Sequence, residues 1–323
     1  MSGAAQLPVY RPLTLGQILE RVWRLLRGNF RTQAGIALIP AVAVFVSYGI
    51  VFGLFGFAIL TEVLRGNQHP AMPNAALVTA GFAAFIVVHL TVLGLYMAAA
   101  TYAGVKADCG IPATMAESYA VAWKRGWHYV GLILSIYGIC FSPALLVEAM
   151  IGGAMAGLAS SKELTPGVVL LIPIGVLLLS AFLIGGVVLG LRLSMAFPAS
   201  VFETLSVGAS IKRSWQLTRG ALGRIFLVVL VVYAVLYVGI MIAMLAMMFV
   251  VFVIALAFSG ASSHPGSHAI WALAICGGAI YLAIVSVFGA CSWMGFAGSF
   301  SVIYNDQRLR IAQPDVAAGR AQE

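Results

Sequence analysis

The sequence is poor in charge. Asp, Glu, Lys and Arg make up 9% of its 323 residues, whereas soluble domains carry about 25%. Hydrophobic residues make up 62% of the chain, and a soluble fold of this size could not bury so much apolar surface. The composition therefore excludes an ordinary soluble domain and predicts a protein that lies in a membrane.

Motifs for catalysis, nucleotide binding and metal binding are lacking as well. No two of the ten acidic residues are close enough in sequence to form an evident acid–base or metal pair, and no two of the four cysteines form a C-x-x-C motif. Walker loops, dinucleotide-binding glycine fingerprints and nucleophile elbows are absent from the sequence. His264 and His268 are separated by Pro265 and Gly266, which disfavours a helical metal pair. We therefore expect no enzymatic activity, no cofactor and no metal site.

Long apolar runs are what the sequence has in abundance. A helix needs about 20 apolar residues to cross the hydrocarbon core of a bilayer. Six runs reach this length, at about 36–60, 76–103, 127–158, 167–197, 225–258 and 270–304. They are continuous, whereas the strands of a membrane barrel alternate polar and apolar positions. We expect one all-α polytopic membrane domain, residues 1–323, with six transmembrane helices.

An internal repeat precedes the runs. Three times a hydroxyl residue is followed nine positions later by tryptophan, in Thr14/Trp23, Thr114/Trp123 and Ser206/Trp215. Each segment has the apolar spacing of an amphipathic helix and is followed by two membrane-length runs. This pattern predicts three repeats, at about 13–106, 113–203 and 205–305, each an interfacial helix lying on the membrane before a transmembrane hairpin, with 306–323 as a tail.

Tryptophan and basic residues in these segments suit the headgroup zone of a bilayer, where the ring is half buried and the cation meets phosphate. Thr14 with Gln17 and Thr114 with Glu117 have the spacing of capping boxes, and Ser206 is a cap without such a partner. Two roles are open for these helices. They set the depth of the transmembrane spans, or they have a function of their own, as lipid sensors or as a docking surface for a cytoplasmic partner. The expected interface residues are Trp23, Arg24, Arg27, Trp123, Lys124, Arg125, Arg213, Trp215 and Arg219.

Basic residues also set the expected orientation. With the N-terminus in the cytoplasm, sixteen of the eighteen Lys and Arg residues fall on or near that side, and only Arg65 and Lys162 do not. Cytoplasmic loops of membrane proteins carry such an excess. We therefore expect a multi-pass protein of the bacterial cytoplasmic (inner) membrane with both termini in the cytoplasm. The net charge of +8 then reflects topology and attraction to anionic lipid, and nucleic acid is not an expected partner.

Four ionisable residues in or beside the runs are candidates for a buried polar pocket. His89 lies near the middle of the second run, Glu148 lies in the third, Arg192 is near the end of the fourth, and Glu203 follows it. Ionisable side chains are costly in hydrocarbon, so each should face protein or water. His89 and Glu148 either exchange protons or hold a polar headgroup in a shared conduit, or they are neutral or close to the interface. Arg192 is expected to reach lipid phosphate or to pair with Glu203.

Several motifs resemble the glycerophosphoryl diester phosphodiesterase membrane-domain family, over nearly the whole chain. They are Pro12-Leu13-Thr14-Leu15-Gly16-x-Ile18-Leu19, Arg192, Phe197-Pro198, Glu203, Arg213-Ser214-Trp215-x-Leu217-Thr218-x-Gly220 and Tyr304-x-Asp306-x-Arg308. In that family the domain sometimes precedes a catalytic phosphodiesterase domain, and many members are standalone polytopic proteins. The resemblance implies this membrane architecture; it does not imply an enzymatic activity for this chain.

Three functions remain open from the sequence. The first is a non-enzymatic protein that transports or binds a lipid or another amphiphile, or supports envelope integrity, with anionic membrane lipids as its partners. The second is a scaffold or regulator that recruits a protein partner on the cytoplasmic face through its interfacial helices. The third is a lipid phosphodiesterase, which the scattered acidic residues and histidines disfavour.

Overall fold

The fold is all-α over the residues that the computed structural model describes, 13–64, 75–161, 166–261 and 267–312. Helices account for all regular structure in these ranges. In chain order they are α1 (Leu15–Gly28), α2 (Phe30–Leu64), α3 (Ala75–Asp108), α4 (Met115–Lys124), α5 (Gly126–Ser161), α6 (Pro166–Leu193), α7 (Ala196–Phe202), α8 (Val207–Thr218), α9 (Leu222–Ala261) and α10 (Ser267–Ala312).

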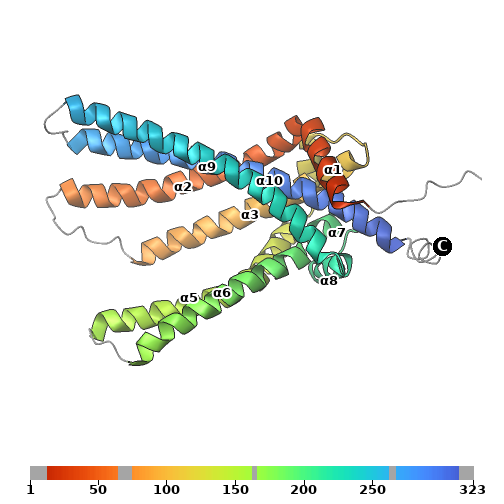
Figure 1. Ribbon diagram of the computed structural model, residues 1–323, viewed down its shortest axis with the longest axis horizontal. Coiled ribbons are helices and arrows are strands. Elements are labelled where there is room, and N and C mark those ends of the chain that lie inside the picture. The colour runs from red at the N-terminus through yellow and green to blue at the C-terminus, as the bar shows by residue number, and fades with distance from the viewer. Residues whose placement is uncertain (1–12, 65–74, 162–165, 262–266, 313–323) are drawn as a thin grey trace, which may run out of the picture.

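Six of these helices, α2, α3, α5, α6, α9 and α10, are long and apolar enough to cross a membrane. This confirms the predicted multi-pass architecture. The short helices α1, α4, α7 and α8 gather at one end of the bundle, and the long helices extend from there to the opposite end (Figure 1). Short and long helices follow one another in the expected order, although duplication of one unit remains a prediction.

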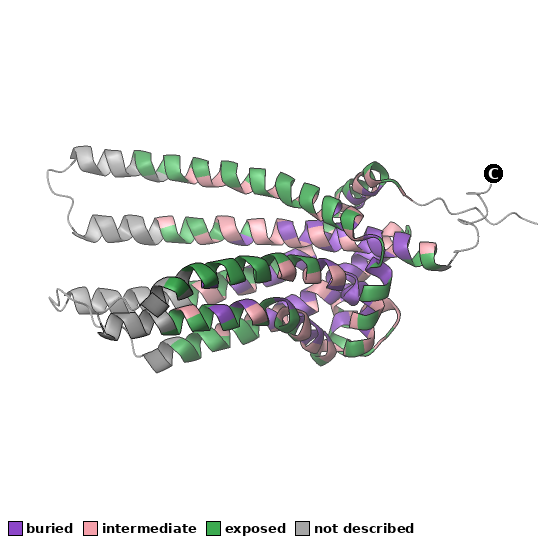
Figure 2. Ribbon diagram, turned by 60° about the horizontal axis from the view of Figure 1, so that its bottom comes forward, coloured by how far each residue is buried: buried purple, intermediate pink, exposed green. Residues whose placement is uncertain are grey.

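The end that carries the short helices also holds the core. Buried residues concentrate there, whereas the long helices become exposed farther out (Figure 2). One buried cluster joins α2, α3, α5, α7 and α10 around Tyr96, Tyr129 and Phe197. A second joins α1, α8, α9 and α10 around Ile18, Ile225 and other side chains. The exposed side chains that the structure describes along the long helices are mostly apolar, as expected for helix surfaces in contact with lipid.

The apolar face of α1 packs on protein, and the expectation that this helix lies in the membrane surface stays a prediction. Ile18, Val22 and Leu25 are 0%, 3% and 6% exposed, and all three belong to the second buried cluster. The same amphipathic pattern fits an apolar layer of lipid or of protein. Here the ends of α9 and α10 supply that layer, so α1 is docked on the bundle. Its tryptophan, Trp23, stays exposed.

The fourth apolar run is divided by a helix break that the sequence did not predict. The run was expected to continue to residue 197, but α6 ends at Leu193 and the short buried helix α7 follows. Ser214 of α8 holds the break, because its hydroxyl donates to the Arg192 carbonyl at 2.6 Å and accepts from the Met195 amide at 3.1 Å. A composition-based span cannot show such a bend, since α7 is as apolar as the helix before it.

Glycine allows the closest helix contacts. A Cβ on Gly94 of α3 would lie 2.9 Å from the Tyr129 carbonyl oxygen of α5, and one on Gly186 of α6 would lie 2.9 Å from the Cys140 carbonyl oxygen. Gly186 is followed four positions later by Gly190, a spacing that permits close contact between membrane helices.

Candidate membrane-interface site

Acidic residues stand where the second long helix of each hairpin ends. Asp108 is the last residue of α3, Glu203 is the C-cap of α7 just after α6, and Asp306 lies in the last turns of α10. Each carboxylate forms an ion pair with an arginine at the short-helix end. Two of the pairs tie the end of a hairpin to a short helix, α1 or α8, and the third joins α9 to α10. Together they define the polar part of the candidate site.

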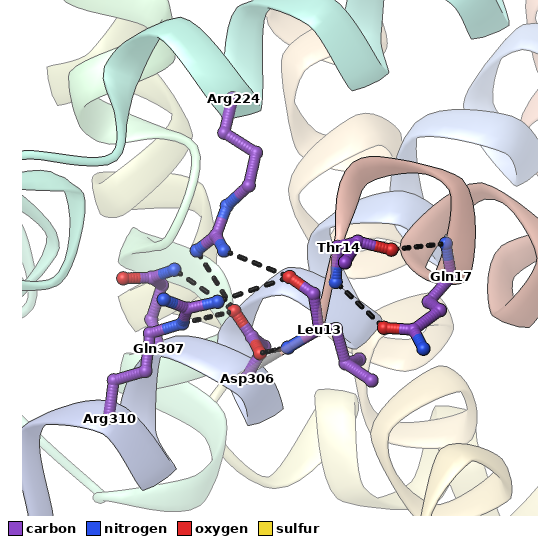
Figure 3. Close-up of polar contacts among 7 residues, drawn as sticks. All are labelled: Leu13, Thr14, Gln17, Arg224, Asp306, Gln307 and Arg310. Atoms are coloured by element: carbon purple, nitrogen blue, oxygen red, sulfur yellow. Dashed lines mark hydrogen bonds and ion pairs between the residues drawn. The ribbon is translucent and has the colours of Figure 1, made fainter. Parts of the chain in front are cut away.

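Asp306 is the most buried of these carboxylates, with a side chain that is 0% exposed. Its Oδ2 accepts from Arg224 of α9 at 2.9 Å and from Arg310 of α10 at 2.8 Å, and its Oδ1 accepts from the amide of Leu13 at 3.1 Å. Both arginines also donate to the carbonyl oxygen of Leu13 (Figure 3). One carboxylate thus fixes the chain just before α1 to the last two membrane helices.

Asp108 plays a matching part on the other side of α1. Its side chain is 1% exposed and accepts from the Arg21 guanidinium, which also donates to the Asp108 carbonyl oxygen at 3.1 Å. The side-chain amide of Asn305 donates to the second carboxylate oxygen at 2.6 Å. The bonds join α1, α3 and α10, so buried carboxylates hold α1 just before its start, at Leu13, and at its middle, at Arg21.

Glu203 pairs with Arg213 of α8, not with Arg192 as one of the sequence expectations had it. The Arg213 Nε lies 2.9 Å from Glu203 Oε2, and the Tyr304 hydroxyl donates to Oε1 at 3.0 Å. The Arg192 guanidinium carbon lies 5.2 Å from the centroid of the Trp215 ring, in cation–π geometry. Because α6 ends one residue after Arg192, its side chain turns toward the exposed ring of α8.

Glu117 of α4 completes the acidic set. The Lys106 ammonium donates to it at 2.8 Å, and the Tyr102 hydroxyl donates to the same oxygen. The Thr114 hydroxyl caps α4 by accepting from the Glu117 amide at 3.2 Å. The predicted capping box is therefore only half formed, because the Glu117 carboxylate binds the lysine instead of returning to the cap. The Thr14 box is complete, and Ser206 caps α8 as expected.

The Glu117 pair gives a testable pH dependence. The hydrogen bond from Lys106 lowers the pKa of the Glu117 carboxyl below its ordinary value. A carboxyl whose pKa is lowered by folding stabilises the protein above its unfolded pKa, and loses that contribution as pH falls through the folded pKa. We expect wild type to melt at a higher temperature than Glu117→Gln at pH 7, and we expect the difference to be smaller at an acidic pH below the ordinary carboxyl pKa. Thermal unfolding of both proteins in detergent measures it; an equal difference at both pH values would contradict this assignment.

Basic residues outnumber these acids, and several have no acidic partner within the part of the chain that the structure describes. They are Arg27, Arg31, Lys124, Arg125, Arg192, Lys212, Arg219 and Arg308. Tryptophan rings are exposed among them: Trp23 is 65% exposed, Trp123 74% and Trp127 87%. The expected interface residues therefore lie at one end of the bundle. Arg24 and Arg213 among them are paired, with Glu20 and Glu203.

A cavity of about 370 Å³ opens at the corner between α4 and α5. Its lining combines residues 123–128, which carry two tryptophans, Lys124, Arg125 and His128, with Thr91, Leu95 and Val130 from the membrane helices. Arg125 is the single residue between the two helices, and its Nη2 donates to the Leu205 carbonyl at 3.0 Å. His128 Nε2 is 2.8 Å from the Ser200 hydroxyl of α7. The lining is cationic at one side and apolar at the other.

His89 and Glu148 lie at different depths along their helices, and a conduit shared by the two stays a prediction. The two helices meet where Gly94 packs on Tyr129 and Ile133. Counted outward from that contact at about 1.5 Å per residue, His89 lies at about 8 Å and Glu148 at about 22 Å. The His89 ring stacks beside Phe85 at 5.8 Å between centroids, and the Glu148 side chain is exposed. Apolar runs fix neither the depth nor the rotation of a residue.

Sequence reasoning missed the roles of Asp108, Asp306 and Glu117. Arg21, Arg224 and Lys106 are 87, 82 and 11 positions away from them, beyond any local motif, and Arg310 alone is near in sequence, four positions after Asp306. A signal was present, because an acidic residue ends every second apolar run. The described residues include no group of three or more His, Cys, Asp or Glu side chains that could hold a metal ion.

The chain stands apart in all three comparisons with known proteins. No protein-family model, curated protein or solved structure matches it. The resemblance drawn from the sequence motifs therefore stays a prediction, and the case for function depends on the geometry of this end of the bundle.

Proposed function

We propose that this protein is a non-enzymatic integral protein of the cytoplasmic membrane that binds anionic amphiphiles, above all phospholipids, at the inner leaflet. In this arrangement the short helices of three repeats lie at the cytoplasmic end, and both termini are cytoplasmic. The observation that carries the proposal is the pairing of charges. Asp108, Glu117, Glu203 and Asp306 each have a basic partner inside the protein, whereas the exposed arginines and lysines among the tryptophans, Arg24 excepted, have no acidic partner within the part of the chain that the structure describes.

Charge and geometry both support this assignment. A basic residue near an anionic leaflet contributes about 1 kcal/mol of attraction. Exposed tryptophans beside such residues suit the headgroup region, since the ring is apolar and its N–H is polar. A soluble acidic protein could also bind the basic residues. It would not account for exposed tryptophans that stand singly on α1, α4 and α8.

Anionic lipid should therefore be enriched around the protein. In nanodiscs of equal phosphatidylglycerol and phosphatidylcholine, we expect co-purified lipid to be enriched in phosphatidylglycerol, and we expect the enrichment to fall at high salt because exposed charges are screened. The triple variant Arg27→Gln, Arg31→Gln, Arg219→Gln should lose most of it. Lipid mass spectrometry after size exclusion provides the measurement. A wild type with no lipid preference would overturn the proposal.

A further inference from the structure

The cavity between α4 and α5 has the composition of a site for one molecule. It is the place where unpaired cations, exposed aromatic rings and a helix start coincide. Lys124 and Arg125 line it, no acidic residue does, and the volume is about 370 Å³, within the usual range for small-molecule sites. The first turn of α5 opens at the cavity, and the first N–H groups of a helix lack intrahelical partners and favour an anion.

The lining also spans two depths of the bilayer. Residues 123–125 form the charged corner, whereas residues 126–128 and Val130 of α5, with Thr91 and Leu95 of α3, belong to helices long and apolar enough to cross the membrane. Leu95 is at the level of the corner, since a Cβ on Gly126 would lie 3.4 Å from its Cδ2. Thr91 is one helical turn deeper. A ligand that fills the cavity would therefore have an anionic group at the corner and an apolar part toward the hydrocarbon.

We propose that this cavity binds the phosphate group of a single anionic phospholipid, with its glycerol and first acyl carbons against Leu95 and Val130. The assignment rests on the proposed function and adds a defined site to it. Lys124 and the first amides of α5 hold the phosphate, and the rings of Trp123 and Trp127 flank it. The bond from Arg125 to the Leu205 carbonyl fixes the corner, so the site is formed before the lipid arrives.

The test uses the whole protein in detergent and three probes: short-chain phosphatidylglycerol, phosphatidylcholine of equal chain length, and inorganic phosphate. Native mass spectrometry counts the bound copies. We expect wild type to retain one phosphatidylglycerol molecule, and we expect Lys124→Gln and Trp127→Ala each to weaken its binding by about tenfold, the loss of one charge-assisted or aromatic contact. Lys212→Gln is the matched control, because Lys212 is exposed on α8 and lies outside the cavity.

Each outcome separates the two proposals. If Lys124→Gln and Trp127→Ala bind the lipid as wild type does, while wild type in nanodiscs still enriches anionic lipid, the cavity assignment fails and the proposed function stands. If inorganic phosphate competes as well as phosphatidylglycerol, the apolar half of the site is wrong. If the protein shows no preference for anionic lipid in either experiment, both proposals fail.

Discussion

Replacing Asp306 with asparagine should lower the free energy of unfolding by about 3 kcal/mol. Removing one partner of a buried ion pair costs about 3–5 kcal/mol, since the other charge is left without compensation. The lower end applies because Arg224 and Arg310 are 21% and 30% exposed and keep some water. Asparagine keeps the shape of the side chain, but its amide also places donors against two guanidinium groups.

Unfolding by sodium dodecyl sulfate titration in mixed micelles, followed by circular dichroism, measures this loss. Glu148→Gln is the matched control: the same chemical change is made to an exposed carboxylate on α5, and we expect it to leave stability within about 0.5 kcal/mol. Equal stability of Asp306→Asn and wild type would show that the Leu13 segment is not held by the charge of this carboxylate.

A valine at Gly94 should also destabilise the bundle strongly. Its Cβ would lie 2.9 Å from the Tyr129 carbonyl oxygen and 3.2 Å from Ile133 Cγ2, so α3 and α5 must separate. Overpacking of this kind costs about 1–3 kcal/mol, and more when backbone has to move. Because the obstacle is a backbone atom, which cannot rotate away as a side chain can, we expect about 3 kcal/mol by the same detergent titration.

The control for this substitution lies on the same helix. Gly81 of α3 has no other atom within 4 Å of its added Cβ, so Gly81→Val tests the helix propensity of valine without the steric clash. We expect that variant to remain close to wild type. Similar losses at the two positions would mean that the effect comes from the backbone of α3 and not from its contact with α5.

The elements that the sequence predicted best are those set by local pattern. Six apolar runs became six long helices, and Thr14, Thr114 and Ser206 each cap the short helix that follows. Span length and capping depend on residues within a few positions of one another. This is why composition and spacing alone were enough for them.

The candidate site was less predictable because it depends on which surfaces meet. The amphipathic pattern of α1 predicts an apolar helix face, but it does not predict whether that face packs on lipid or on protein. In the structure Ile18 of this face is buried against the bundle. Arg192 and Arg213 are both near Glu203 in sequence. The bend after α6 decides which of them forms the ion pair, and the partner is Arg213. The cavity joins α3 to the α4–α5 corner, so its lining could not be read from any one segment.

The bond between Leu13 and Asp306 joins positions 293 residues apart, which sets an order of assembly. The first helix leaves the ribosome long before its final anchor exists. Arg21 gains its partner Asp108 when the first hairpin is complete, but the segment before it is secured only when the last helix has been inserted. A chain that stops before α10 lacks Asp306. The segment before α1 would then have no carboxylate to bind, although the earlier helices are present.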